Sequence, residues 1–172
     1  MKITVTGQSG TGSTTTAKLL ASKLQYTFVS AGEVFREFAT KLQMDIKSFD
    51  EYVQEHPEYD FAIDKKQAEF GKTNDNFVYE SRLGWRLIPD SVKILITCSI
   101  EPRIQRVMSK ENIGEDVAKE HIEKREQSHK KRFFDQHGIE NALEPSHFDF
   151  VIDSSTDKPE VIVEKILVLL SK

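Results

Sequence analysis

Along this 172-residue chain, segments whose hydrophobic residues form short strand-like runs alternate with segments whose hydrophobic residues recur at helical spacing. Short runs rich in β-branched and aromatic residues predict five strands, at 2–6, 27–30, 76–81, 92–99 and 148–153. Between the strands, apolar positions recur at helical spacing, which predicts helices at 13–24, over most of 31–72, and at 102–110, 115–135 and 159–170. Strands that alternate with helices predict an α/β fold in which helices cover both faces of a five-stranded parallel sheet.

Two helical stretches exceed what such a sheet requires, namely 31–72 and about 107–137. We expect both to be insertions within a single domain that spans residues 1–172. The helix at 115–135 is very polar, with Val117 and Ile122 as its main apolar anchors. A helix with so few anchors should pack weakly on the core, and we interpret it as a mobile lid.

Composition narrows the possible functions without defining one. The chain is 38% hydrophobic and 30% charged, with a formal net charge of −4, which argues against a protein that coats nucleic acid. No apolar stretch is long enough to cross a membrane, and no cleavable signal pattern precedes the first strand. Cys98 is the single cysteine, and we expect it to be a buried apolar residue. These features favour a cytoplasmic protein, and the lack of an apolar surface stripe favours a monomer.

A glycine-rich turn joins the first strand to the first helix, and its sequence is GQSGTGST. Such a turn surrounds an anion with backbone N–H groups at the N-terminus of a helix. Thr14 stands where the hydroxyl residue of a phosphate-binding loop contacts Mg²⁺, but Ser13 stands where most such loops have a lysine. A dinucleotide-binding fingerprint would need a glycine in place of Ser9. The predicted ATP-binding residues of the loop are Gly7, Gln8, Ser9, Gly10, Thr11, Gly12, Ser13, Thr14 and Thr15.

Arginine is scarce in this chain, which has 17 lysines but only seven arginines. A guanidinium grips phosphate with two parallel hydrogen bonds, which an ammonium cannot do. Arg103 and Arg106 lie three residues apart, and Arg125 and Arg132 lie seven apart, so each pair shares one helix face. Ordinary surface ion pairs could explain any one arginine, but the set as a whole favours phosphate binding.

Together these motifs resemble the nucleoside monophosphate kinase family, and more narrowly the short cytidylate kinases typical of archaea. The similarity covers nearly the whole chain. It includes TGQSGTGSTTTAKLL, SAGEVFR, DFAIDKKQ, YESRLGW and the lid segments EPRIQR and REQSHKKRFF. The resemblance implies ATP as phosphoryl donor, a nucleoside monophosphate as acceptor, and Mg²⁺ held by Thr14 and Glu80. It also implies acceptor binding by Ser30, Gly32, Arg36, Asp60, Asp64, Gln67 and Arg82, ATP binding by Arg103 and Arg106, and catalysis by Thr14, Arg82, Arg125 and Arg132.

Two departures from the family pattern leave the acceptor open. Ser81 replaces the glycine expected before Arg82, and Leu83 alone separates that arginine from Gly84, where the family pattern has a longer spacing. His129 stands where the pattern has an acidic residue. The preferred function is phosphorylation of CMP or dCMP. One alternative is a kinase of AMP, UMP or another small molecule, and another is a catalytically silent nucleotide-binding regulator.

Overall fold

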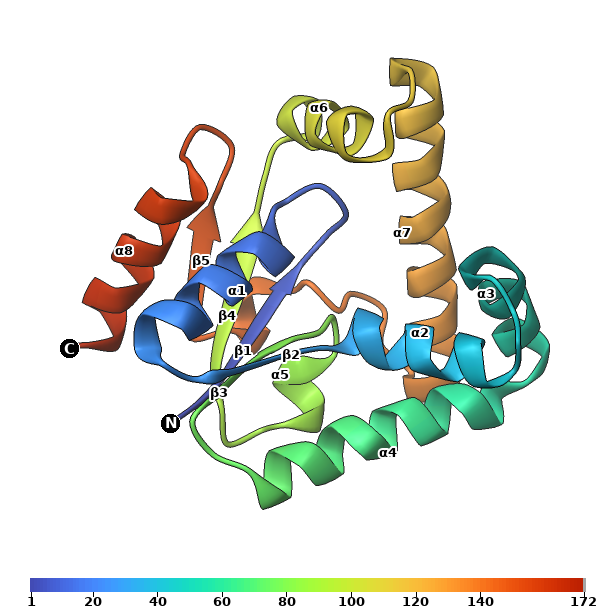
Figure 1. Ribbon diagram of the computed structural model, residues 1–172, viewed down its shortest axis with the longest axis horizontal. Helices are drawn as coiled ribbons and strands as arrows, with labels where there is room; N and C mark the ends of the chain where they lie inside the picture. The colour runs from blue at the N-terminus through green and yellow to red at the C-terminus, as the bar shows by residue number, and fades with distance from the viewer. Residues whose placement is uncertain (172) are drawn as a thin grey trace.

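The chain folds around a five-stranded parallel sheet with the strand order β2-β3-β1-β4-β5 (Figure 1). The computed structural model describes residues 1–171. The strands are β1 (Lys2–Gly7), β2 (Thr27–Ser30), β3 (Phe77–Glu80), β4 (Val92–Thr97) and β5 (Phe150–Asp153). The helices are α1 (Ser13–Leu24), α2 (Ala31–Lys41), α3 (Ile46–Glu55), α4 (Pro57–Thr73), α5 (Gly84–Leu87), α6 (Ile100–Glu111), α7 (Glu115–His137) and α8 (Pro159–Leu170), with the 3-10 turn η1 (Pro145–His147). The predicted fold class is confirmed.

Successive side chains of each strand point to opposite faces of the sheet, so the core has two parts, one on each face. Ile3 and Val5 of β1 are fully buried and pack against α1 and α8. Phe77 and Tyr79 of β3 point to the opposite face, where Ile88 and residues of α4 cover them. Because side chains alternate along a strand, Val78 of β3 points to the face of Ile3 and Val5, so β3 supplies apolar contacts to both layers.

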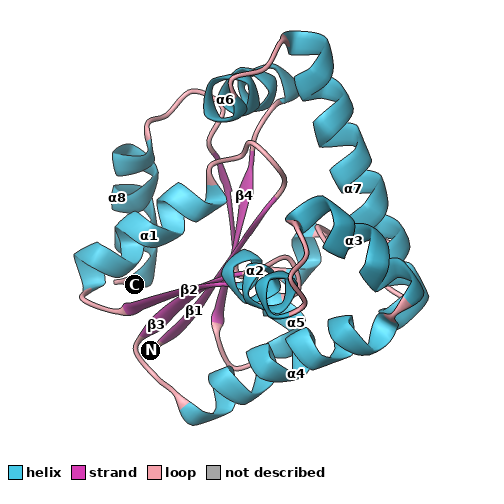
Figure 2. Cartoon of the chain, turned by 45° about the vertical axis from the view of Figure 1, so that its right-hand side comes forward, coloured by secondary structure: helices cyan, strands magenta, loops and turns pink. Residues whose placement is uncertain are grey.

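The surplus helices form two groups beside the sheet. Helices α2, α3 and α4 enclose their own apolar cluster around Phe49 and Val53. Helix α7 packs on α6 through Ala118 and Ile122, and its far end reaches toward α3 and α4 (Figure 2). Val117, predicted as an anchor, is instead 43% exposed, and Ala118 is the buried neighbour. The prediction of Val117 as an anchor is therefore wrong by one position around the helix.

Most predicted elements agree with the structure to within two residues at each end. The four-residue helix α5 is absent from the prediction, and Gly84 at its start packs closely against Thr4. Cys98, expected to be buried, is only partly buried, and Arg106 Nη1 lies 3.3 Å from its sulfur. Within residues 1–171, no helix has the length and apolar character that a membrane crossing requires.

Candidate active site

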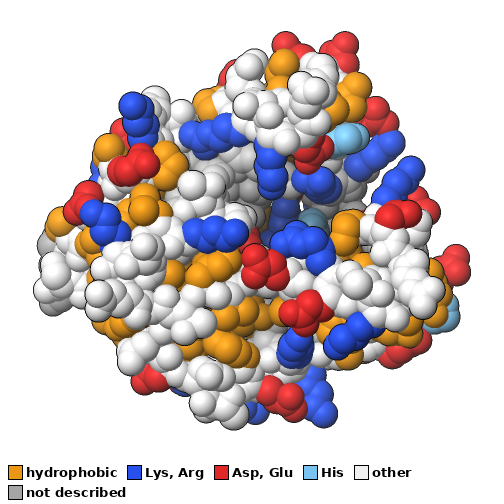
Figure 3. Space-filling view, viewed as in Figure 1, with side chains coloured by type: hydrophobic (Ala, Val, Ile, Leu, Met, Phe, Trp, Pro, Cys, Tyr) orange, Lys and Arg blue, Asp and Glu red, His pale blue; other side chains and the backbone are white. Residues whose placement is uncertain are grey.

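A cleft of about 1400 Å³ opens at the carboxyl ends of the strands. The loop after β1 forms one side, helices α2 and α4 form another, and α6 and α7 complete it. Figure 3 shows Lys and Arg side chains gathered around this hollow. All the predicted site residues line the cleft except Arg103, whose side chain lies against the loop and is nearly buried. Ligands of open parallel α/β sheets bind at this edge.

The loop after β1 has the backbone path that an anion cradle needs. Gly10 and Gly12 have φ angles of 83° and 84°, in the left-handed region that residues with a Cβ rarely adopt. At Gly10 a Cβ would also lie 2.6 Å from the carbonyl oxygen of Arg103. The first backbone bond of α1 runs from Thr16 N–H to Gly12 O at 2.9 Å. The N–H groups of Ser13, Thr14 and Thr15, which open α1 before this bond, are therefore available to an anion.

Two arginines of α6 support this loop from behind. Arg103 Nε donates to Ser9 O at 2.7 Å, and its Nη1 donates to Gln8 Oε1 at 3.1 Å. Arg106 Nη1 donates to Thr11 O at 3.1 Å and its Nη2 to Ser154 O at 2.6 Å. These guanidinium groups fix the loop through its carbonyl oxygens and add positive charge beneath the cradle.

Ser13 and Glu80 meet at the base of the loop. The buried Ser13 hydroxyl donates to Glu80 Oε1 at 3.3 Å, and Ser30 Oγ donates to Glu80 Oε2 at 2.8 Å. Thr14 is exposed in the cleft beside them. Lys18, one helical turn beyond Thr14, is 57% exposed, and its Nζ lies 3.8 Å from Glu33 Oε1.

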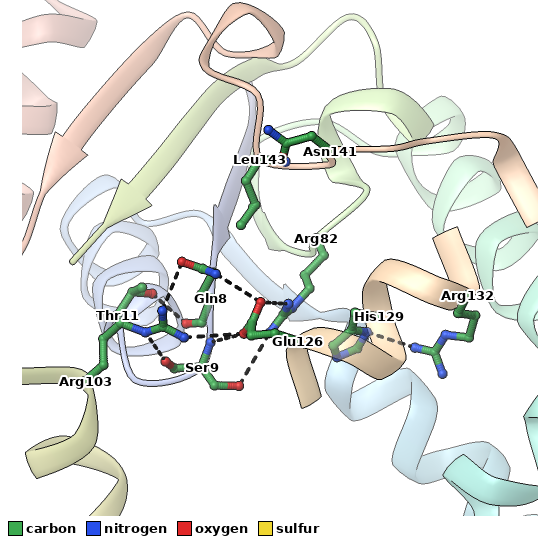
Figure 4. A network of polar contacts seen from close by, with 10 residues as sticks. All are labelled: Gln8, Ser9, Thr11, Arg82, Arg103, Glu126, His129, Arg132, Asn141 and Leu143. Atoms are coloured by element: carbon green, nitrogen blue, oxygen red, sulfur yellow. Dashed lines mark hydrogen bonds and ion pairs between the residues drawn. The ribbon is translucent and has the colours of Figure 1, made fainter. Parts of the chain in front are cut away.

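The carboxylate of Glu126, on α7, lies against the loop (Figure 4). Arg82 donates to both of its oxygens, at 3.0 and 3.1 Å, and the N–H of Ser9 donates at 3.3 Å. Gln8 Nε2 donates at 3.1 Å and Arg103 Nη2 at 3.4 Å. Burial alone would raise the pKa of Glu126, but the charge and hydrogen bonds of Arg82, with the donors of Gln8 and Ser9, bring it below the ordinary value. The loop and two arginines thus already bind one anionic group.

The opposite wall of the cleft carries two carboxylates on α4, one buried and one partly buried. Asp60 and Asp64 lie one turn apart, and burial raises the pKa of both. Gln136 Nε2 donates to Asp60 at 2.5 Å, and His137 Nε2 lies 2.8 Å from Asp64 Oδ2. Gln67, one further turn along, is also buried, whereas Arg36 on α2 is exposed at the rim. The predicted acceptor residues of α4 therefore do lie together.

The sequence of residues 2–156 matches the model of the cytidylate kinase-like family. The chain belongs to this family. It is 38% identical over 170 residues to the cytidylate kinase of Methanobrevibacter smithii, covering 99% of this chain and 98% of that protein. It is 36% identical over 174 residues to the cytidylate kinase of Sulfolobus acidocaldarius, covering 100% of this chain and 95% of that protein. The predicted family is confirmed.

A solved structure supports the fold independently of sequence. Shikimate kinase from Bacteroides thetaiotaomicron superposes with a TM-score of 0.66 at 14% identity, covering 100% of this chain and 99% of that one. At 14% sequence identity, this likeness supports a shared fold and nothing about function.

Within this family member, helix α7 carries the predicted lid arginines in two different environments. Arg125 is 52% exposed and pairs with Glu111 at 3.1 Å. Arg132 is 11% exposed, with Nη1 3.3 Å from Asp50 Oδ1 and Nε 3.4 Å from Asp60 Oδ2. Burial and the charges of the neighbouring arginines hold the pKa of His129 well below its usual value, so its imidazole is neutral and accepts from Arg132 Nη2 at 3.2 Å.

Several polar residues of the cleft are absent from the sequence-based prediction. They include Asp50, Ser81, Glu111, Gln136 and Ser154, and beside the cleft the prediction also lacks Glu126, which binds Gln8 of the loop. One signal was available for α7, because His129, Arg132 and Gln136 recur at helical spacing and so face one side. The partners of Glu126 lie 23 to 118 residues away, and no local pattern specifies such pairs.

Proposed function

We propose that the protein is an ATP-dependent cytidylate kinase, which transfers the γ-phosphoryl group of ATP to CMP or dCMP and yields ADP and the diphosphate. One observation carries this proposal. The anion cradle after β1 faces, across one cleft, a wall of buried and partly buried carboxylate and amide groups, with arginines on the elements between. The cradle suits the donor's phosphates, and the polar wall suits a base with hydrogen-bonding edges.

The transfer needs alignment and charge neutralisation more than a general base. The acceptor's phosphate has a second pKa of about 6 and is mainly a dianion at neutral pH. One of its oxygens attacks the γ-phosphorus, the bond to the β–γ bridging oxygen breaks, and ADP leaves with the electron pair. Negative charge spreads over the transferred group, so arginines aimed at it supply most of the catalysis.

The residues divide by the part of the reaction that they serve. Gly7 to Thr15, with Arg103 and Arg106 behind them, bind the donor's phosphates. Arg82, at the end of β3, lies between donor and acceptor and neutralises the transferred group together with Arg125 and Arg132. Ser30, Gly32 and Arg36 bind the acceptor phosphate, and Asp60, Asp64 and Gln67 bind its base.

The oxygen donors at the base of the loop suit Mg²⁺. Within residues 1–171, no three His, Cys, Asp or Glu side chains gather as a metal cage. Mg²⁺ is commonly held by only one or two protein oxygens, with phosphates and water completing its shell. Thr14 and Glu80 would hold it, and it would screen the charge of the β- and γ-phosphates.

Segments 31–72 and about 107–137 serve, in this proposal, as the acceptor-binding insertion and the lid. Glu126 uses the same donors that a γ-phosphate would need. Binding of ATP therefore requires the Glu126 carboxylate to leave Arg82 and Ser9, and α7 then moves relative to the loop.

The decisive test is ADP formation from Mg-ATP with CMP, dCMP, UMP, AMP and GMP as acceptors. We expect turnover with CMP and dCMP well above the other three. Turnover with another monophosphate alone would support a kinase of a different acceptor. Binding of ATP without turnover of any acceptor would support a silent regulator and contradict the proposal.

A further inference from the structure

A chain of hydrogen bonds connects the end of β3 to the acceptor wall. The N–H of Leu83 donates to Ser81 Oγ at 3.3 Å, and Ser81 Oγ lies 2.7 Å from Gln67 Oε1. Gln67 Nε2 lies 3.3 Å from Asp64 Oδ1. Ser81 and Gln67 are 5% and 4% exposed, so water does not compete freely for these groups.

The direction of donation along this chain follows from the chemistry of each group. The Asp64 carboxylate can only accept, so the Gln67 nitrogen faces it and the amide oxygen faces Ser81. The Ser81 hydroxyl donates to that oxygen, and a flipped amide would leave its hydrogen without this acceptor. Asp64 accepts from Gln67 on one oxygen and from His137 on the other. Both ends therefore oppose a flip of the Gln67 amide.

The fixed amide presents a defined pair of groups to the cleft. Gln67 and Asp64 both line it, and the Gln67 nitrogen has a second hydrogen beyond the one that Asp64 receives. The pair thus offers one N–H donor beside one carboxylate acceptor. We infer that Ser81 is a specificity-determining residue, which locks the amide of Gln67 so that Gln67 and Asp64 select an amino-bearing pyrimidine over a keto-bearing one. This inference rests on the proposed function.

Cytosine and uracil differ at the edge that such a pair would contact. Cytosine has its N4 amino donor beside the N3 acceptor, which matches a carboxylate beside an amide N–H. Uracil has the O4 acceptor beside an N3–H donor, which is the reverse order. If the sugar and phosphate hold the ring in one register, uracil meets this pair with acceptor against acceptor and donor against donor. Only a flipped Gln67 would relieve part of that mismatch, and the Ser81 hydroxyl opposes the flip.

The test compares CMP with UMP as acceptors for the full chain and for Ser81→Ala. One neutral hydrogen bond contributes about 0.5–1.5 kcal/mol, so its loss should lower the ratio of kcat/KM for CMP to that for UMP by roughly 3- to 10-fold. The loss should appear mainly as a higher KM for CMP, with kcat less affected. Ser91→Ala is the matched control, because Ser91 is 6% exposed, bonds to Thr4 and Ile88, and does not line the cleft. Its ratio should equal that of the unmodified chain.

A second variant keeps the inference testable if Ser81→Ala does not fold. Gln67→Met preserves the size of the side chain but removes the N–H donor, and it should lower the CMP-to-UMP ratio at least as much. If the unmodified chain prefers CMP and neither folded variant changes the ratio, the role of Ser81 and Gln67 is refuted while the kinase proposal stands. If the unmodified chain phosphorylates no monophosphate, the proposed function itself fails.

Discussion

Replacing Glu126 with glutamine should make the protein bind ATP more tightly and, without ligand, make it less stable. The Glu126 carboxylate accepts hydrogen bonds from Arg82, Ser9, Gln8 and Arg103. ATP must take over these donors, so the affinity observed is reduced by the fraction of molecules in which Glu126 holds them. Glutamine has nearly the same shape, but it lacks the negative charge and offers only one acceptor oxygen.

The size of the effect follows from the number and exposure of these contacts. Hydrogen bonds to charged groups contribute about 1.5–3 kcal/mol each when well shielded, but Arg82 and Glu126 keep 17% and 23% of their side-chain surface in water. We therefore take about 1–2 kcal/mol for the whole interaction, which corresponds to a 5- to 30-fold tighter Kd for ATP. Loss of the same energy in the unliganded protein should lower Tm by about 2–8 °C, at roughly 2–4 °C per kcal/mol for a domain of this size.

Titration calorimetry with ATP, without acceptor, measures the first effect, and thermal unfolding without ligand measures the second. Glu123→Gln is the matched control, because Glu123 lies exposed on the same helix, one turn earlier, whereas Glu126 is half-buried against the loop. Opposite signs for affinity and Tm, seen only at Glu126, would confirm competition. A Glu126→Gln variant that binds ATP no more tightly than the unmodified protein would refute it.

Three further predictions follow from the environments of single residues. Arg125→Ala should lower kcat by more than 100-fold with Tm nearly unchanged. Arg132→Ala should lower both kcat and Tm, because Arg132 is 11% exposed and paired with Asp50. Steady-state kinetics and thermal unfolding of the two variants check this. Folding lowers the pKa of His129, so below about pH 6.5 the unfolded chain binds more protons than the folded protein, and the stability of the fold falls as pH decreases. His129→Gln should therefore flatten the dependence of Tm on pH between about 5 and 7. Gly10→Ala should abolish measurable ATP binding, because a Cβ there would meet the Arg103 carbonyl oxygen and the φ angle of 83° strains any residue with a Cβ. An unchanged Kd for ATP, measured by calorimetry on the folded variant, would contradict this.

The sheet and the loop could be predicted because their signals are local. Each strand is a short apolar run, and each covering helix repeats its apolar positions within a few residues. The glycines that shape the anion cradle lie within six residues of one another. Helix α5 was missed because four residues are too few for a periodic pattern, and its position depends on the contact of Gly84 with Thr4, 80 residues away.

The partners of the arginines could not be predicted in the same way. Helical spacing placed Arg103 and Arg106 on one face, and the structure has them there, but their hydrogen bonds go to backbone carbonyl oxygens of the loop. The sequence contains no marker for an arginine whose acceptor is a carbonyl 95 residues away. Likewise, the residue type of Ser81 departs from the family pattern, but its contact with Gln67 appears only once α4 lies beside β3.

The serine in the lysine position has a physical explanation in this arrangement. Ser13 is 6% exposed, and its hydroxyl donates to Glu80, so a lysine side chain starting there would lie against that carboxylate. An ion pair between the two would neutralise the acidic group that we place beside Mg²⁺. Arg82, Arg103 and Arg106 instead bring three guanidinium groups to the loop, from the segment after β3 and from α6. The loop therefore has positive charge around its phosphate site without a lysine of its own, because arginines of neighbouring elements supply that charge.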